Sequence, residues 1–146
     1  MDPSAPIVIG YDDSAFARAA VRRGLSLAAK LGVKVRLLRA WTVSNAPRPK
    51  TWEPGYVPPV DDFAAAVLEE LGVEVAGILA EFPQVEVSLE APHGPAGREL
   101  VAASAQAQLV VVGSRGLGGL SERLLGSVSE EVTRRAHCDV LVVRKS

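Results

Sequence analysis

Residues 7–41 read IVIGYDDSAFARAAVRRGLSLAAKLGVKVRLLRAW, and they contain the first strand, helix and strand of the predicted fold. Two apolar runs rich in β-branched residues, 7–9 and 35–41, frame the stretch. Nearly continuous apolar runs are typical of strands that are buried on both faces, as in parallel sheets. Between the runs, apolar residues recur at helical spacing, and Gly32 follows as a helix stop. These helical positions are Ala17, Ala20, Val21, Gly24, Ala28 and Leu31.

The same alternation continues to the end of the chain. Apolar runs at 109–112 and 140–143 predict two more buried strands, while the alternating residues 85–89 predict a strand with one wetter face, which suits an edge. Three further apolar stripes at helical spacing lie between the runs. Their members are Val67, Leu68, Leu71, Val75, Ile78 and Phe82; then Ala96, Leu100, Ala103 and Ala107; then Leu125, Val128, Val132 and Ala136.

Strict alternation of strands and helices predicts one α/β domain over residues 1–146. We expect a five-stranded parallel doubly wound sheet of the Rossmann or flavodoxin-like kind, in the order 3-2-1-4-5, with helices on both faces. In such sheets ligands bind beyond the carboxyl ends of the strands, where the winding reverses. The loops that follow Ile9 and Val112 should therefore meet and form the site.

Composition narrows the class of protein. The chain has 146 residues, 48% apolar and 23% charged, and its net charge is -1. The basic residues are dispersed, apart from short pairs such as Arg22-Arg23 and Arg134-Arg135, so no nucleic-acid partner is expected. No apolar run reaches the roughly 20 residues of a membrane span, and no secretory leader is visible. With Cys138 as a lone, buried thiol, we expect a cytoplasmic protein without a membrane partner.

The candidate site is a glycine-rich stretch, VVGSRGLGGLSERLLGSVSEEV, at residues 111–132. Glycines let backbone N–H groups approach an anion, and Gly126-Ser127 opens a helix whose amino end favours negative charge. Ser127 or Ser129 should cap that helix or donate to phosphate oxygens. The stretch predicts a phosphate site, although neither the Walker Gly-Lys-Ser/Thr ending nor GxGxxG is present.

The spacing of Gly113, Gly116 and Gly126-Ser127 resembles the motif G-x2-G-x9-G-(S/T) of the ATP-binding branch of the universal stress protein family. The resemblance covers essentially the whole chain. The opening IVIGYDDSAFARAAVRRGLSLAAKLG is similar to the family's first strand, acidic turn and first helix. LLRAW resembles its second strand, and HCDVLVVRKS its closing strand.

The resemblance implies that the chain binds ATP together with Mg²⁺ or Mn²⁺. Asp12, with Gly10 beneath it, would face the adenine and ribose, and the backbone of Ala40 would meet the adenine edge. The implied phosphate and ribose contacts come from Val112, Gly113, Arg115, Gly116, Gly126, Ser127, Val128 and Ser129. The family also commonly dimerises through its closing strand, here residues 140–143, and such an edge strand would otherwise expose unpaired backbone groups.

Two positions depart from the family pattern. Asp12-Asp13-Ser14 stands where the family often has Asp-Gly-Ser, and Cys138-Asp139 stands where Cys-Pro is usual. Asp13 adds negative charge near a polyanion unless it turns away or helps to hold a metal. Ser14 is expected to cap the first helix. Arg115 and Arg123 would either neutralise phosphate or be solvated, and the pairs Glu69-Glu70 and Glu130-Glu131 are expected to be solvated.

No catalytic residues are predicted, because the sequence suggests no pairing of His93 or His137 with a nucleophile. The leading hypothesis is a nucleotide-dependent regulatory or stress-response module with at most slow ATP hydrolysis, acting on an unidentified signalling protein. One alternative is a true ATP-hydrolysing or nucleotidyl-transferring enzyme. The other is an interaction protein with a vestigial pocket.

The proline-rich segment 44–60 interrupts the alternation, with five prolines in SNAPRPKTWEPGYVPPV. Long loops inside compact domains are often functional. Segment 44–60 begins shortly after the second strand, near the expected adenine contact at Ala40. One hypothesis is therefore that the segment is a mobile flap in which Trp52 and Tyr56 cover the base. The alternative is that these aromatic side chains pack on the second helix or on a dimer partner.

Overall fold

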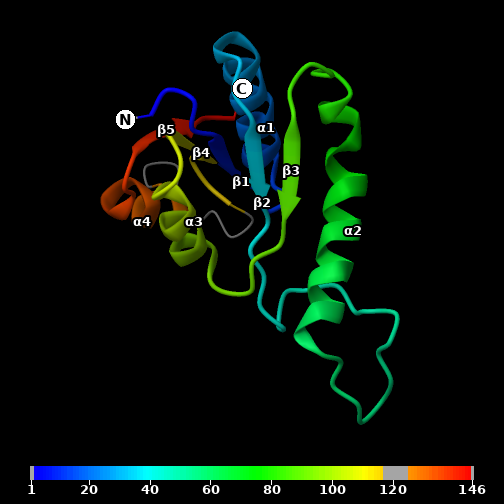
Figure 1. Cartoon of the computed structure of the whole chain (residues 1–146). Helices are drawn as coiled ribbons and strands as arrows, with labels where there is room; N and C mark the ends of the chain where they lie inside the picture. The colour runs from blue at the N-terminus through cyan, green and yellow to red at the C-terminus, as the bar shows by residue number, and fades with distance from the viewer. Residues whose placement is uncertain (1, 117–124, 146) are drawn as a thin grey trace.

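The computed structural model describes residues 2–116 and 125–145. Its five strands form one parallel sheet in the order β3-β2-β1-β4-β5, which confirms the predicted topology (Figure 1). The elements in chain order are β1 Ile7–Gly10, α1 Ala15–Leu31, β2 Val35–Leu38, α2 Val60–Leu79, β3 Val87–Glu90, α3 Ala96–Ser104, β4 Leu109–Gly113, α4 Ser127–Arg135 and β5 Asp139–Val143.

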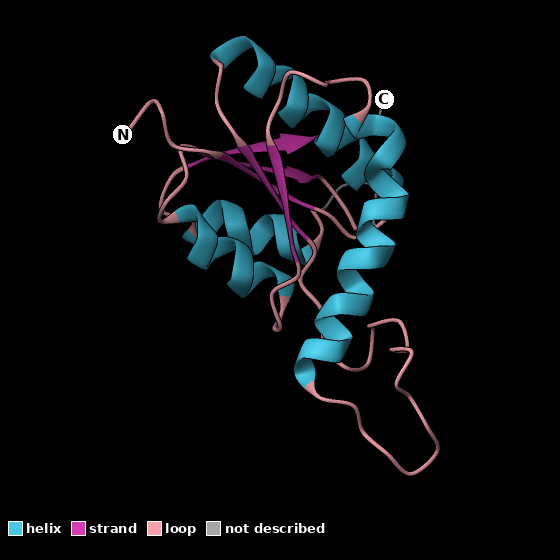
Figure 2. Ribbon diagram, turned by 45° about the vertical axis from the view of Figure 1, so that its right-hand side comes forward, coloured by secondary structure: helices cyan, strands magenta, loops and turns pink. Residues whose placement is uncertain are grey.

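Helices cover both faces of the sheet (Figure 2). Successive residues of β1 point to opposite faces. Ile7 and Ile9 pack with α1 and α2, whereas Val8 packs in a second cluster with residues of α3 and α4. All three side chains are fully buried, and burial of each contributes about 1.5–3 kcal/mol to the fold. The doubly wound arrangement thus follows from the continuous apolar runs.

The first helix begins and ends where the sequence predicts. The Oγ of Ser14 accepts the amide of Ala17 at 3.0 Å, so Ser14 is the N-cap. Gly32 ends α1 in the left-handed conformation, at φ 69°. The apolar stripe ends at Ala28, however, because Leu31 is the last residue of the helix and is 56% exposed.

Several element ends differ from the sequence-based expectations. β2 ends at Leu38, and Trp41 instead forms an isolated parallel bridge with His93. Ala107 follows the end of α3, and Leu125 precedes α4 and is 42% exposed. Periodicity marks the middle of an element well, but its ends depend on local hydrogen bonds.

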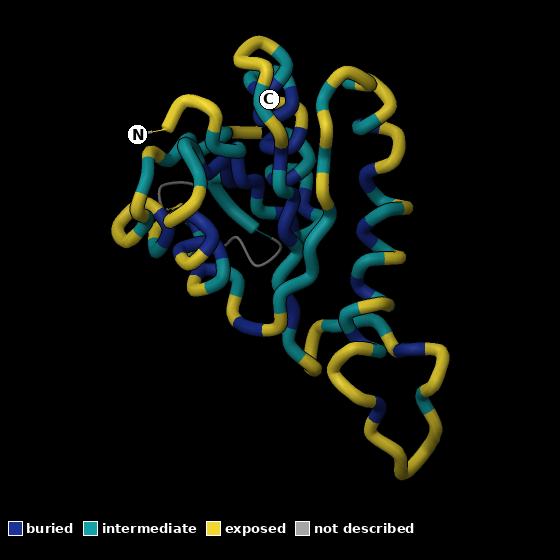
Figure 3. Tube along the Cα trace, in the orientation of Figure 1, coloured by how far each residue is buried: buried dark blue, intermediate teal, exposed yellow. Residues whose placement is uncertain are grey.

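The proline-rich segment 44–60 extends past the amino end of α2 and is largely exposed (Figure 3). Trp52 is an exception, because it packs against the buried cluster of Trp41, Phe63 and Val67. Phe63 and Val67 belong to α2, so the alternative of packing on the second helix holds for Trp52. Tyr56 is 48% exposed.

Two further expectations concern the chain's exterior. Within the residues that the structure describes, no helix is both long and apolar enough to cross a membrane. Cys138 is half-buried rather than buried, and partial burial raises the pKa of its thiol. It lies just before β5, which is an edge strand of the sheet.

Candidate functional site

The carboxyl ends of β1 and β4 lie side by side, since the two strands pair in parallel with Ile9 opposite Val111. The loops that follow them meet, as the sequence predicts. The Oδ1 of Asp12 accepts the amide of Ser14 at 3.0 Å. Its Oδ2 lies so close to Gly116 that a Cβ there would overlap it. The acidic turn and the glycine stretch therefore form one surface.

Gly113 brings the end of β4 against the first turn of α1. A Cβ at Gly113 would lie 2.7 Å from the Cβ of Phe16 and 2.8 Å from its carbonyl carbon. Such contacts with backbone leave no room for any other residue. Val112 precedes Gly113 and is buried, with its side chain in the cluster facing α3 and α4. Val112 can thus contribute only its main chain to a site.

The two ends of the glycine stretch are joined by hydrogen bonds. The amide of Gly126 donates to the carbonyl oxygen of Ser114 at 2.8 Å, and the amide of Ser114 donates to the carbonyl oxygen of Val143 at 2.8 Å. The Oγ of Ser129 also donates to the Ser114 carbonyl, at 3.1 Å. One carbonyl therefore holds the amino end of α4 against the end of β4. Residues 117–124, including Arg123, lie outside the described residues.

Gly126 packs tightly on the other end of the stretch. Its Cβ position lies 3.1 Å from the Cα of Arg115 and 3.3 Å from the amide nitrogen of Gly116. Its φ of -63° is open to any residue, so close approach explains the glycine better than backbone conformation does. A side chain here would push Arg115 and Gly116 away from α4.

The amino end of α4 is the part of the site best suited to an anion. The amides of Ser127, Val128 and Ser129 open this nine-residue helix, and first-turn amides lack partners within their own helix. The N-cap Gly126 provides no side-chain cap. The predicted serine cap is therefore wrong: Ser129 is buried and bonds to carbonyl oxygens, while Ser127 is exposed.

Gly10 and Ala40 lie at the same edge on neighbouring strands. Gly10 pairs with Leu38, so Asp12 and Ala40 each follow this pair by two residues. A Cβ at Gly10 would lie 2.8 Å from the Cδ1 of Leu100 in α3, so a larger residue here would have to displace the end of that side chain. The guanidinium of Arg115 lies 5.9 Å from the Phe16 ring, over α1.

Asp13 turns away from the glycine stretch. It has a positive φ of 65°, and its Oδ1 binds Arg18 at 2.7 Å and the Tyr11 hydroxyl at 2.9 Å. Its contact with Glu74, together with Tyr11 and Arg18, lowers the pKa of the Asp13 carboxyl. Burial and the bond to Asp13 raise the pKa of Tyr11 to about 12. The extra charge of the acidic turn is therefore paired within the protein.

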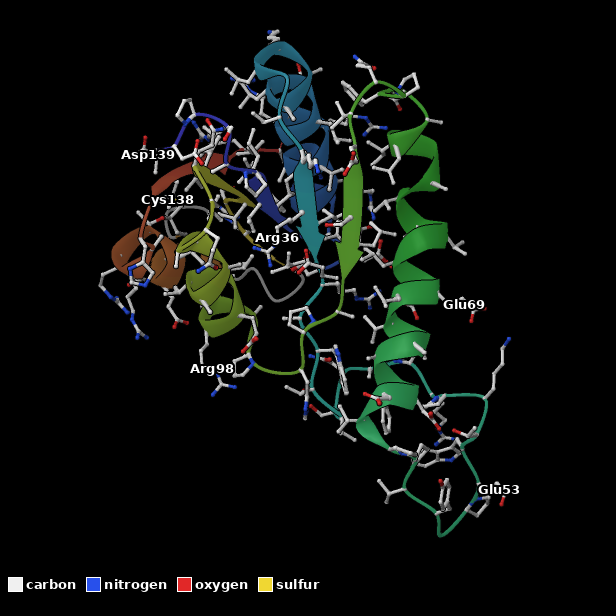
Figure 4. All side chains as sticks on the ribbon, viewed as in Figure 1. Arg36, Glu53, Glu69, Arg98, Cys138 and Asp139 are labelled. Atoms are coloured by element: carbon white, nitrogen blue, oxygen red, sulfur yellow. The ribbon has the colours of Figure 1, made fainter. Side chains whose placement is uncertain are left out.

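A charge network beside this turn is not evident from the sequence. Arg39 binds Glu74 at 2.7 Å and Glu70 at 3.1 Å. Burial, followed by the contact with Asp13, raises the pKa of Glu74 to about 7, and this outweighs the opposite effect of Arg39. Glu70 was expected to be solvated but pairs with Arg39, whereas Glu69 points away from the sheet (Figure 4). The spacing of Glu70 and Glu74, one helical turn apart, was the available signal.

The histidines have structural surroundings. His93 stacks on Trp41 with ring centroids 4.4 Å apart. The backbone amide of His137 donates to the Oγ of Ser104. Within residues 2–116 and 125–145, no group of three His, Cys, Asp or Glu side chains is placed to hold a metal ion.

Comparison with known proteins identifies the family. The model of the Universal stress protein family matches residues 4–144. The chain belongs to the universal stress protein family. It is 37% identical over 149 residues to Universal stress protein Rv2005c of Mycobacterium tuberculosis, covering 99% of this chain and 48% of that protein. With Universal stress protein Rv2623 of the same species it shares 34% identity over 142 residues, covering 97% and 46%. This universal stress protein thus spans about half the length of these curated relatives.

Solved structures agree on the fold. Universal stress protein UspA from Lactobacillus plantarum superimposes with a TM-score of 0.68 at 20% identity, covering 97% of this chain and 98% of that one. A universal stress protein in complex with cAMP superimposes with a TM-score of 0.66 at 28% identity, and 98% of each chain is covered.

Proposed function

We propose that this universal stress protein binds ATP, with Mg²⁺ or Mn²⁺, at the edge between β1 and β4. It would act as a nucleotide-dependent regulatory module in a stress response, with at most slow hydrolysis. The observation that carries the proposal is the cradle of Gly113, Gly116 and Gly126, whose Cβ positions are occupied by neighbouring atoms. These glycines let the end of β4, the acidic turn and the amino end of α4 approach closely, and main-chain N–H groups gathered beside a helix amino end suit phosphate groups.

The phosphates would lie at the amino end of α4. The amides of Ser127, Val128 and Ser129 would donate to the outer phosphate oxygens, helped by the positive end of the helix. Gly113, Arg115 and Gly116 would line the α-phosphate and ribose. Binding at this end of α4 needs no rearrangement of the Ser114 carbonyl, which holds the helix in place.

The adenosine would lie toward β1 and β2. Asp12 follows β1 with its Oδ2 beside Gly116, which suits a hydrogen bond from a ribose hydroxyl. Ala40 lies at the equivalent place after β2, where backbone groups can read the purine edge. The structural relative at 28% identity was solved in complex with cAMP, an adenine nucleotide, and this supports the choice of base.

A divalent cation would be held chiefly by the phosphates, as Mg²⁺ usually is in nucleotide sites. The described residues offer no cluster of three metal-binding side chains, which fits a cation that arrives with its nucleotide. Asp13 would take no part, because its carboxylate is bound to Arg18.

A regulatory role fits the arrangement better than rapid catalysis. The His93 ring stacks on Trp41, and the contact given for His137 is made by its backbone amide, so no contact among the described residues places an imidazole as a base at the glycine cradle. The module would signal through a partner protein that reads its nucleotide state, and we infer that it pairs with a second copy through the outer edge of β5. A true ATP-hydrolysing or nucleotidyl-transferring enzyme is the second candidate.

The test begins with mass spectrometry of any small molecule released when the purified protein is denatured. Calorimetry with ATP, cAMP and GTP, each with and without Mg²⁺, should then show tightest binding for ATP with the metal. Binding of none of these nucleotides would contradict the proposal and favour a vestigial pocket. Multiple turnovers of ATP at a substantial rate would instead favour the enzyme.

A further inference from the structure

A groove of about 510 Å³ lies between α1 and the end of β5, apart from the glycine cradle. None of the residues that line it belongs to the candidate nucleotide site. Its lining consists of Ala15, Arg18, Ala19, Arg22, Arg23, Ser26, Val143, Arg144 and Lys145. Five of these nine side chains are cationic and none is acidic.

The groove unites two basic segments that are far apart in the sequence. Arg18 and Arg22 are four residues apart and share a face of α1, and Arg23 lines the groove from the adjoining face. Arg144 and Lys145 directly follow β5, which the Val143–Ser114 hydrogen bond holds beside β4. The dispersed distribution inferred from the sequence is therefore wrong for this region.

Within residues 2–116 and 125–145, two of the five cations have carboxylate partners. Arg18 pairs with Asp13 at 2.7 Å, and Arg22 makes a longer contact of 3.4 Å with Glu81. Among the described residues, Arg23, Arg144 and Lys145 have no acidic partner within 4.0 Å. The groove is thus an anion-attracting site on a chain whose net charge is -1.

We propose that this groove binds a short linear polyphosphate. Arg18 and Arg23 are five residues apart, about 7.5 Å along the helix axis, so the cations are spread over a length that suits a chain of phosphates better than a single phosphate. The guanidinium groups suit paired hydrogen bonds to phosphate oxygens. The small side chains Ala15, Ala19 and Ser26 leave the groove floor open.

The lining favours phosphate over a nucleotide base or a nucleic acid. No aromatic side chain lines the groove, so a base would have no ring on which to stack. Nucleic-acid binding usually needs an extended basic face. Here the acids Asp13 and Glu81 pair with two of the lining arginines and limit the cationic area.

The experiment is calorimetry of the intact protein with sodium tripolyphosphate at low salt. Arg23→Gln/Arg144→Gln removes two unpaired cations, and loss of such charge-assisted contacts should weaken binding by roughly tenfold or more. Arg134→Gln/Arg135→Gln is the matched control, because it removes two adjacent exposed arginines from α4, outside the groove. Melting curves establish that both variants are folded; all four side chains are exposed in the native protein.

Further titrations distinguish tripolyphosphate from other ligands and the groove from the glycine cradle. Inorganic phosphate should bind the unmodified protein much more weakly than tripolyphosphate, and a thymidine oligonucleotide should not bind. Because the glycine cradle is itself a proposed phosphate site, the titrations are repeated in the Gly126→Val protein, where the tripolyphosphate binding that remains should be weakened by Arg23→Gln/Arg144→Gln. The proposal is overturned by undetectable tripolyphosphate binding, by equal affinity in the groove and control variants, by loss of binding in Gly126→Val, or by tighter oligonucleotide binding that depends on Arg23 and Arg144.

Discussion

The carbonyl oxygen of Ser114 accepts the amide of Gly126 at 2.8 Å, so the residue just after β4 holds the residue just before α4. This bond closes the glycine stretch whatever path residues 117–124 take. It fixes the amino end of α4 at the edge of the sheet. The bond therefore holds in place the helix end that is proposed to bind phosphate, and a helix end held in this way loses less entropy on binding.

Replacing Gly126 with valine tests the proposed site directly. The new Cβ would lie 3.1 Å from the Cα of Arg115 and 3.3 Å from the amide nitrogen of Gly116, and its methyl groups would press further on both. We expect the affinity for ATP to fall by roughly tenfold or more, because displaced amides lose hydrogen bonds to charged oxygens. Calorimetry measures the change. An unchanged affinity in a folded Gly126→Val protein would remove the cradle from the site.

Replacing Gly77 with alanine should stabilise the protein. Gly77 lies inside α2, and nothing lies within 4 Å of its Cβ position. A helix-interior glycine is about 0.5–1 kcal/mol worse than alanine, so urea unfolding should show a gain of this size. Nucleotide affinity should not change, which makes this variant a control for Gly126→Val. A loss of stability would mean that Gly77 contacts a second molecule, because nothing in the described part of the single chain lies near its Cβ position.

The Glu74 carboxyl should make stability depend on pH. Its pKa rises from an ordinary 4.5 to about 7 in the folded protein because of burial and the contact with Asp13. The folded state therefore holds this proton more tightly than the unfolded state does. The stabilisation of the folded state by protonated Glu74 is fully present below about pH 4.5 and is lost as the pH rises toward 7.

Glu74→Gln keeps a neutral donor for Asp13 and leaves Glu70 to pair with Arg39. Relative to the unmodified protein, we expect the variant to gain on the order of 2 kcal/mol in unfolding free energy between pH 5 and pH 8. Denaturant unfolding across this range measures the gain, with Glu69→Gln as an exposed control. A constant difference across the pH range would mean that Glu74 does not titrate there.

The outer edge of β5 should mediate the proposed homodimer. The carbonyl of Val143 bonds to Ser114 on the β4 side, so the backbone groups of Val142, one residue earlier, face outward. Val142→Pro removes an outward donor, whereas Val142→Thr keeps it with a similar side-chain volume. Light scattering should give a dimer mass for the unmodified protein and the threonine variant, and a lower mass for the proline variant. A monomeric unmodified protein at micromolar concentration would rule out this interface.

The proline-rich segment 44–60 should keep its position when ATP binds. The Oγ1 of Thr51 donates to Asp62 of α2 at 2.6 Å, and Trp52 packs beside Phe63. Lys50 has a 91% exposed side chain, so trypsin should cleave after it readily. We expect the same cleavage rate with and without saturating ATP. Protection by ATP would instead support the flap hypothesis.

Much of the fold is determined by sequence patterns that act locally. The apolar runs at 7–9 and 109–112 specify buried strands, and Ser14 and Gly32 mark the limits of α1 because caps depend on adjacent residues. The glycine spacing also predicted a site in the loops that follow β1 and β4, and these loops lie against each other, with Asp12 beside Gly116. These features are readable because each depends on neighbours within a few residues.

Other features depended on how distant segments meet. The Arg39–Glu74 pair joins the end of β2 to α2, and the basic groove joins α1 to the residues after β5. The cap that was one of two roles expected for Ser127 or Ser129 is not made: Ser129 instead donates to the Ser114 carbonyl, which the packing of α4 beside the end of β4 brings within reach. Helical periodicity places Arg18 and Arg22 on one face of α1, but only the packing of α1 beside β5 decides that Arg23, Arg144 and Lys145 line the same groove.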